Sequence, residues 1–148
     1  MVNKFYVASI ILLFVLGTFF ILGWKSPNVI AQFPNSFKVG DKISGDVTIT
    51  IEQGDSISAD TPILIALSSS NGGVLEANTM TFKEFTSYSK DLPIETQKEG
   101  KIYYETPGKY SVDISKVIDY KFIDKGNYEL TFVIFALDIS QNLPIEVN

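Results

Sequence analysis

A run of twenty nearly uninterrupted apolar residues, Phe5 to Trp24, follows only four residues at the start of the chain. At a rise of 1.5 Å per residue, a helix of this length spans roughly 30 Å, the thickness of a bilayer's hydrocarbon core. Tyr6 and Trp24 stand at its ends, where amphipathic rings favour the membrane interface, and Lys4 and Lys25 flank it. The run therefore predicts a transmembrane helix or signal anchor at residues 5–24, with Phe5, Tyr6, Trp24 and Lys25 as anchor residues.

A cleaved signal peptide is the alternative for this run. The hydrophobic region of a signal peptide is usually shorter than twenty residues, but Val29-Ile30-Ala31 offers small or modest side chains to a signal peptidase. Cleavage near Ala31 would release a secreted domain. For an anchor, the simplest topology has residues 1–4 in the cytoplasm and the domain on the extracytoplasmic side.

Three residue types are absent from the chain. It has no Cys and no His, and all twelve basic residues are Lys. Disulfides, thiolate zinc sites, the commonest general base and the bidentate guanidinium are therefore all excluded. We expect no cofactor and no enzymatic activity.

The part of the chain beyond Lys25 is acidic. It has ten Lys against seventeen Asp and Glu, a balance of −7. Such a surface repels polyanions, so we expect no nucleic-acid partner. An acidic domain instead suits a position away from anionic lipid headgroups.

Residues 25–36 are expected to be a linker between the span and the domain. Pro27 and Pro34 prevent this segment from continuing the helix. Val29, Ile30 and Phe33 are apolar for a pure spacer, so they are expected either at the headgroup level or in a first strand along the domain.

From Phe37 onwards the apolar pattern has period two. Ile43, Val47, Ile49 and Ile51 alternate with polar residues, which is typical of a half-buried strand. A capping box at residues 81–84 predicts one or two helical turns, and residues 115–120 are expected to form another. The other expected strands lie at 62–67, from 74, 101–105, 110–114, 126–139 and 143–147, the last suiting an edge because of Pro144. About seven strands and one or two short helices predict a mainly β, antiparallel sandwich over residues 37–148.

The segment from Asp124 to Leu130, DKGNYEL, resembles the D-x-G-x-Y-x-C motif of immunoglobulin-like domains. The resemblance implies that Gly126 allows a tight strand entry and that Leu130 takes the place of the Cys. It also implies that Tyr128 forms a tyrosine corner, with a buried ring and a hydroxyl bonded to the backbone upstream.

The segment from Gly40 to Val47, GDKISGDV, is similar to the opening of arrestin-like sandwich domains. That similarity implies a turn at Gly40 and a bulge at Gly45. Together the two resemblances cover residues 37–148. The chain departs from antibody domains in having no disulfide pair and no Trp after Trp24.

Two groups of residues are weak candidates for a site. Glu52, Asp55 and Asp60 come close together in sequence, and loop carboxylates can bind Ca²⁺, but ordinary solvated acids are the simpler interpretation. Tyr103 and Tyr104 are adjacent in one expected strand, so one ring must face outward. That ring either takes part in recognition or lies over the sheet.

These features favour a non-enzymatic, membrane-anchored domain that binds or assembles at the cell surface. Its partner would be another protein or subunit, reached through loops or through sheet edges such as 143–147 and whatever precedes Phe37. A pilin-like subunit of a surface filament is one alternative. An acid-only hydrolase, which would need two carboxylates in a cleft, is the other.

Overall fold

A computed structural model describes residues 28–34 and 36–148. The predicted span at 5–24, its anchor residues Phe5, Tyr6, Trp24 and Lys25, and the cytoplasmic segment 1–4 lie outside the described residues. Among the residues described, no helix has the length and apolar character needed to cross a bilayer.

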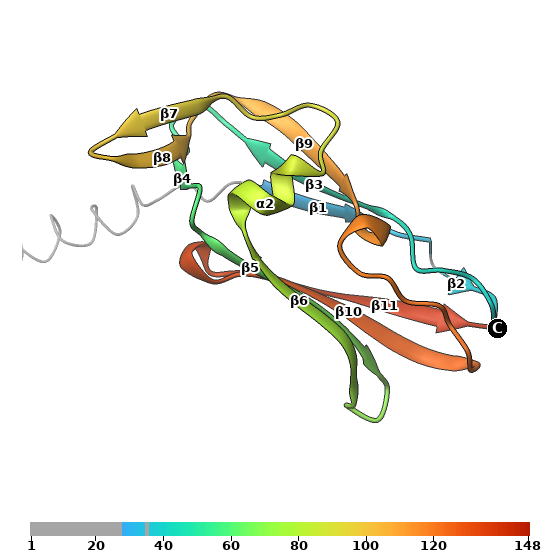
Figure 1. Cartoon of the computed structure of the whole chain (residues 1–148). Helices are drawn as coiled ribbons and strands as arrows, with labels where there is room; N and C mark the ends of the chain where they lie inside the picture. The colour runs from blue at the N-terminus through green and yellow to red at the C-terminus, as the bar shows by residue number, and fades with distance from the viewer. Residues whose placement is uncertain (1–27, 35) are drawn as a thin grey trace, which may run out of the picture.

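The described residues form three β-sheets, and two of them pack face to face as the two large sheets of a sandwich (Figure 1). The smaller sheet has the order β1-β3-β9, and both neighbouring pairs are antiparallel. Its strands are β1 (Asn28–Gln32), β3 (Asp46–Ile51) and β9 (Gly108–Asp113). Of the two alternatives for the segment around Val29, the structure has the strand, because Val29 pairs with Ile49 and is buried.

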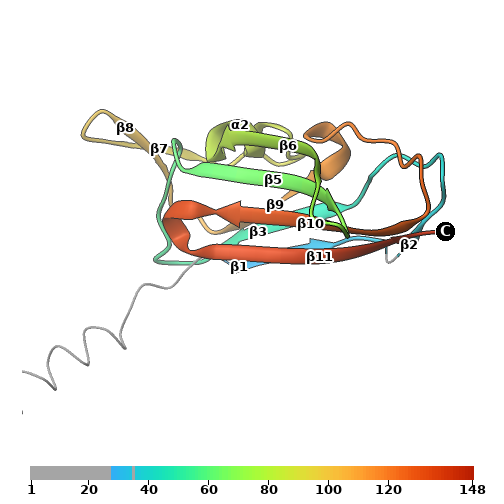
Figure 2. The same ribbon diagram turned by 90° about the horizontal axis from the view of Figure 1, so that it is seen from below.

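The larger sheet has five strands in the order β2-β11-β10-β5-β6, and Figure 2 shows the last four side by side. All its pairs are antiparallel except β2 with β11. Its strands are β2 (Ser36–Phe37), β5 (Pro62–Ser69), β6 (Val74–Thr81), β10 (Gly126–Ile134) and β11 (Ile139–Val147).

A third, small sheet and one short helix lie at one end of the sandwich. The sheet has the order β4-β8-β7, and its β7–β8 hairpin projects from the body in Figure 1. The elements are β4 (Ile57–Ser58), α2 (Phe82–Ser87), β7 (Glu95–Lys98) and β8 (Lys101–Tyr104). Two 3₁₀ turns complete the fold: η1 (Ile114–Lys116) and η2 (Phe135–Leu137).

The core is the layer between the two large sheets. Alternate residues of β3, β5 and β10 point into it, and α2 adds two Phe rings. Phe85 of α2 packs against Phe132 of β10, with ring centroids 5.7 Å apart. Phe82 packs against Tyr104 at 5.4 Å. The helix therefore closes one side of the sandwich through its aromatic residues.

The capping box that predicts α2 is confirmed. Thr81 Oγ1 accepts from the Glu84 N–H at 3.2 Å, and the Thr81 N–H donates to Glu84 Oε2 at 2.7 Å. The turn expected at 115–120 begins one residue earlier, at Ile114, where the Asp113 carboxylate accepts from the Ser115 N–H.

The prediction of one strand over residues 126–139 is wrong at its C-terminal end. β10 stops at Ile134, η2 follows, and the chain reverses at Asp138, which has φ +52°. Asp tolerates this left-handed conformation better than most residues. The strand therefore ends inside an apolar run, where the hydrophobic pattern gives no sign of a break. The following strand, β11, is accordingly longer than the expected 143–147.

Eleven strands are described where about seven were expected. The four that were missed or left open are short: β1, β2, β4 and β7. Two-residue strands such as β2 and β4 have no period to detect. The expected edge at Pro144 is partly correct, because β2 pairs only with Glu146 and Val147 of β11.

The tyrosine corner implied by the resemblance is present. Tyr128 is 8% exposed, and its hydroxyl donates to the Asp124 carbonyl at 2.8 Å. Gly126 has φ +146°, and Leu130 is fully buried. Burial raises the pKa of the Tyr128 hydroxyl, so the hydroxyl stays protonated, and able to donate, to a higher pH than an exposed tyrosine does.

The two glycines of the arrestin-like segment also have positive φ, +97° at Gly40 and +141° at Gly45. The turn at Gly40 is confirmed. Gly45, however, precedes β3 directly, so the expected bulge within the strand is wrong. The ring of Phe33 occupies the space where a side chain at position 45 would lie. Packing against Phe33 is therefore a reason for a glycine at this position.

Candidate binding surface

Strand β6 is a long, open edge of the five-stranded sheet. It pairs with β5, and no other described strand pairs with its second side. Six consecutive residues, from Val74 to Thr79, are exposed on both faces of the strand. Figure 1 shows the β5–β6 turn extending beyond the body of the sandwich. This edge is therefore accessible to another chain.

The direction of the β6 backbone groups follows from its register with β5. Pro62 lies opposite Thr81, and the Thr81 N–H bonds to Glu84 instead of to β5. The next residue, Phe82, donates to Thr61 O at 2.8 Å. Because antiparallel pairs alternate, the backbone N–H and C=O groups of Ala77 and Thr79 point away from β5, towards the open side.

The side chains of β6 do little to prevent pairing. Val74 is 65% exposed and Leu75 is 38% exposed, and the only charge in the strand is Glu76. Natural edge strands are usually protected by Lys, Pro, strong twist or a covering element. β6 has no Lys and no Pro, and its one irregularity is a bulge at Leu75, near the turn.

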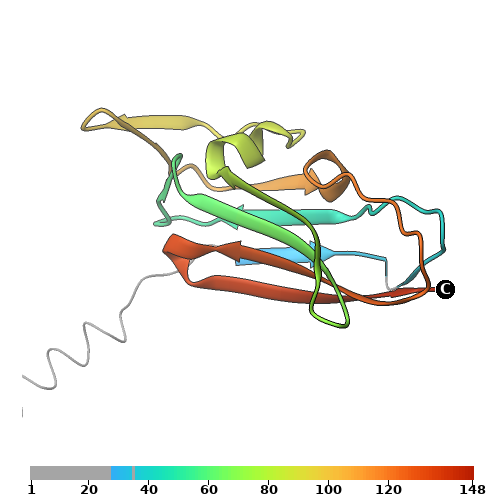
Figure 3. The same ribbon diagram turned by 60° about the horizontal axis from the view of Figure 1, so that its bottom comes forward.

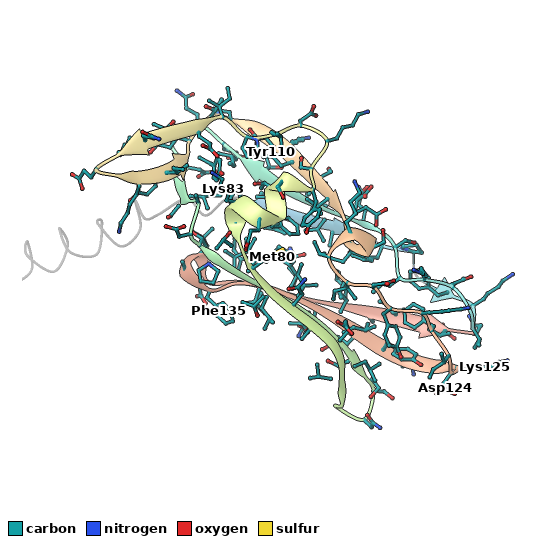
Figure 4. All side chains as sticks on the ribbon, in the orientation of Figure 1. Met80, Lys83, Tyr110, Asp124, Lys125 and Phe135 are labelled. Atoms are coloured by element: carbon teal, nitrogen blue, oxygen red, sulfur yellow. The ribbon has the colours of Figure 1, made fainter. Side chains whose placement is uncertain are left out.

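The outer face of the five-stranded sheet continues this surface. Residues that alternate with buried ones point outward, and those nearest β6 are uncharged. We call the following set the outer patch: Leu64, Ala66, Ala77, Thr79, Thr131 and Val133. Phe135 of η2, 58% exposed, lies close to the end of β10, where Figure 4 labels it.

The other edge strands are shorter than β6, including the six-residue β9. β1 and β11 lie close enough for Gln141 Nε2 to donate to Val29 O at 2.6 Å, which ties the two large sheets together along one side. β7 is four residues long and includes Glu95 and Lys98. At eight residues, β6 is the longest edge strand in the three described sheets. Figure 3 shows how far its hairpin reaches.

The weak metal candidates are not brought together. Asp55 is 4% exposed, and its Oδ2 accepts from the Glu52 N–H at 2.8 Å, so the carboxylate holds the turn after β3. Its Oδ1 is buried without a hydrogen-bond partner. Within residues 28–34 and 36–148, no three acidic side chains lie close enough together to hold a metal ion. Glu52, Asp55 and Asp60 therefore do not form such a group.

The two adjacent tyrosines face opposite ways, as a strand requires. Tyr104 is 2% exposed and points inward, with its hydroxyl 3.4 Å from Glu95 Oε1. Tyr103 is half-buried. The longest exposed edge lies in β6, for which the sequence predicted only a strand that begins at residue 74.

A groove of about 310 Å³ lies beside α2 and ends at Tyr104. Lys83 of α2, labelled in Figure 4, forms an ion pair with Glu95 across it, Nζ to Oε1 2.9 Å. The hydrogen bond from Lys83 lowers the pKa of Glu95. The remaining lining residues are Thr86, Ser87, Leu92 and Pro93.

The environment of Tyr104 gives a testable pH dependence. Burial, and then the charge of Glu95, raise the pKa of its hydroxyl from 10.0 to about 12. A raised pKa in the folded state favours the neutral form, so this stabilisation is complete below pH 10 and is lost as the pH rises towards 12. We expect tyrosinate absorbance to show a late transition that Tyr104→Phe makes smaller, while Tyr110 and Tyr128 still contribute to it because burial raises their pKa values too. Ionisation of every tyrosine near its ordinary pKa would contradict this.

No model of a protein family matches the chain, and no curated protein matches it either. Among solved structures, similarity extends to the CARDB domain of PF1109 from Pyrococcus furiosus, at 9% identity and a TM-score of 0.49. The match covers 84% of this chain and 97% of that one. A β-glucosidase from Listeria innocua matches at 10% identity and 0.44, with 84% of this chain and 16% of the other covered.

The CooA pilin subunit from enterotoxigenic Escherichia coli matches at 11% identity and a TM-score of 0.30, over 83% of this chain and 96% of that one. At these TM-scores the likenesses carry no inference about function. The topology can be judged from the strands themselves.

In immunoglobulin domains, strands A, B and E form one sheet with D, strands C, F and G form the other, and C′ can extend the second. The order β1-β3-β9 corresponds to A-B-E, and β11-β10-β5-β6 corresponds to G-F-C-C′. Tyr128 stands at the start of the strand that corresponds to F, where the tyrosine corner belongs. By strand order and by its tyrosine corner, the described domain is an immunoglobulin-like β-sandwich.

Proposed function

We propose that this chain is a non-enzymatic domain anchored in the cell membrane by residues 5–24, and that it binds or assembles with another protein on the extracytoplasmic side. The observation that carries the proposal is the open edge of β6, with six consecutive exposed residues and outward backbone groups at Ala77 and Thr79. A strand edge of this kind offers main-chain hydrogen bonds to an incoming strand.

The position of β1 favours an anchor over a cleaved signal. Cleavage after Ala31 would cut within β1 and separate Val29, which is 6% exposed in the core, from the domain. It would also remove the carbonyl to which Gln141 donates. Retaining β1 keeps the attachment between the two large sheets.

Single-cysteine variants test the placement, because the chain has no Cys of its own. Lys125→Cys lies in an exposed loop of the domain, and Val2→Cys lies in the predicted cytoplasmic segment. In intact cells, a membrane-impermeant maleimide is expected to label the first variant, and the second only after lysis. The protein should also stay in the membrane pellet after carbonate extraction.

The opposite labelling pattern would contradict the proposed topology. Mass spectrometry of the same membranes gives an independent check. A mature N-terminus near Gln32 would show that the signal is cleaved and the domain is secreted. A mature N-terminus at Phe5, in protein from isolated filaments, would favour the pilin-like alternative.

A further inference from the structure

We propose that the partner of β6 is a second copy of this chain, and that two copies pair antiparallel through β6 about a two-fold axis at Ala77. This rests on the proposed function and adds the identity of the partner. The pairing would join two five-stranded sheets into one continuous sheet and satisfy the outward backbone groups of Ala77 and Thr79 in both copies.

Charge and hydrogen bonding select the register. A two-fold axis at Glu76 places two like charges directly opposite each other, which is destabilising. An axis at Asn78 places Leu75 opposite Thr81, whose N–H is already bonded to Glu84. An axis at Ala77 avoids both problems.

With the axis at Ala77, Glu76 lies opposite Asn78 of the second copy, and Leu75 lies opposite Thr79. The carboxylate therefore lies opposite an amide whose Nδ2 donates to Val117 O at 2.9 Å and keeps a second hydrogen to donate. An exposed aliphatic side chain lies opposite a Thr methyl group. At the axis itself the two side chains are methyl groups, which allow close approach. β6 is thus complementary to itself in this register, which an isologous contact between two copies requires.

The second argument for a copy as occupant is the continuity of the uncharged surface. The outer patch reaches the edge at Ala77 and Thr79, so antiparallel pairing places the two patches side by side on one face of the joined sheet. A strongly acidic partner would find no opposite charge on β6, and a Lys-rich partner would find a single one, because Glu76 is the only charged residue of the strand. A strand with the composition of β6 itself fits.

Antiparallel pairing also sets the direction of the two anchors. A two-fold axis perpendicular to the sheet reverses the strand direction, so the two β1 strands begin at opposite ends of the joined sheet. Only three residues separate the predicted span from β1. The arrangement therefore fits two copies that reach towards each other from facing membranes.

Disulfide trapping of the full chain in detergent micelles tests the pairing. Ala77→Cys places two sulfurs across the axis, where opposed residues have Cα atoms about 5.5 Å apart, within disulfide range. Ala66→Cys is the matched control on the same face, one strand further in on each copy. Its two Cα atoms would be three strand spacings apart, roughly 14 Å, beyond that range.

Under mild oxidation we expect a reducible dimer from Ala77→Cys and none from Ala66→Cys, while a maleimide labels both. A dimer from Ala66→Cys alone would overturn the edge pairing in favour of face-to-face packing. If neither variant forms a dimer, the second copy is not the partner. Neither of these two results would change the labelling of Lys125→Cys in intact cells. The labelling experiment therefore tests the proposed function independently of the pairing.

Vesicles test the facing-membrane arrangement. Phosphatidylcholine vesicles that carry the full chain with its domain outward are expected to cluster, because many weak edge contacts between two vesicles give a high combined avidity. Ala77→Lys, which puts two like charges on the axis, should abolish clustering, whereas Ala66→Lys should retain it. Equal clustering by both variants, or none by the unmodified chain, would contradict the proposal.

Discussion

Replacing Phe132 with Ala is expected to lower the free energy of unfolding by about 3–5 kcal/mol. Phe132 is fully buried in the central strand of the five-stranded sheet, and its ring packs against Phe85 of α2. Its removal leaves a cavity between the two large sheets, where β5 and β11 hold the backbone on both sides. Urea unfolding of the full chain in micelles, followed by circular dichroism, measures the loss.

Val133→Ala is the matched control for this experiment. It is the next residue of β10, only half-buried, and it points to the outer face of the sheet. We expect it to cost about 1 kcal/mol or less, because little apolar surface is withdrawn from water there. Similar losses from both variants would contradict the assignment of the inner and outer faces.

Gly45→Ala is expected to destabilise the domain more than Gly126→Ala does. The two glycines have similar backbone conformations, φ +141° and +146°, so a side chain introduces backbone strain of about 1–3 kcal/mol at each. At Gly45 the new Cβ would lie 2.6 Å from Cδ1 of Phe33. At Gly126 nothing lies within 4 Å of it.

The overlap with Phe33 should add about 1–3 kcal/mol to the cost at Gly45. Thermal or urea unfolding of the two variants gives the comparison. In a double-mutant cycle, Phe33→Ala should reduce the difference between the glycine variants. If Gly45→Ala and Gly126→Ala lose equal stability, the contact with Phe33 has no energetic role.

Much of the local structure could be predicted because it depends on neighbouring residues. The alternation of Val47, Ile49 and Ile51 is confirmed as β3, and the Thr81–Glu84 capping box is confirmed at α2. Both signals arise within one turn of helix or a few residues of strand. The end of β10 was predicted wrongly because an apolar run through Phe135 conceals a reversal that depends on the conformation of Asp138.

The candidate site was much less accessible to such reasoning. The expected partner edges were 143–147 and the segment before Phe37. Strand β11, however, pairs with β10 along one side, and on the other side its end pairs with β2 while Gln141 reaches Val29. The open edge is β6, whose residues give no sign of it in isolation. Tyr104, a candidate for recognition, is buried beneath α2.

By itself the sequence determined the hydrophobic run at Phe5 to Trp24, the acidic domain without Cys, His or Arg, and the tyrosine corner at Tyr128. Composition and short-range spacing are enough for these features. Only the tertiary structure decided which strands are neighbours and which edge is left bare, because strand order depends on contacts between distant segments. Leu67 of β5 pairs with Leu130 of β10, and the last strand in that order, β6, has no strand on its second side among residues 28–34 and 36–148.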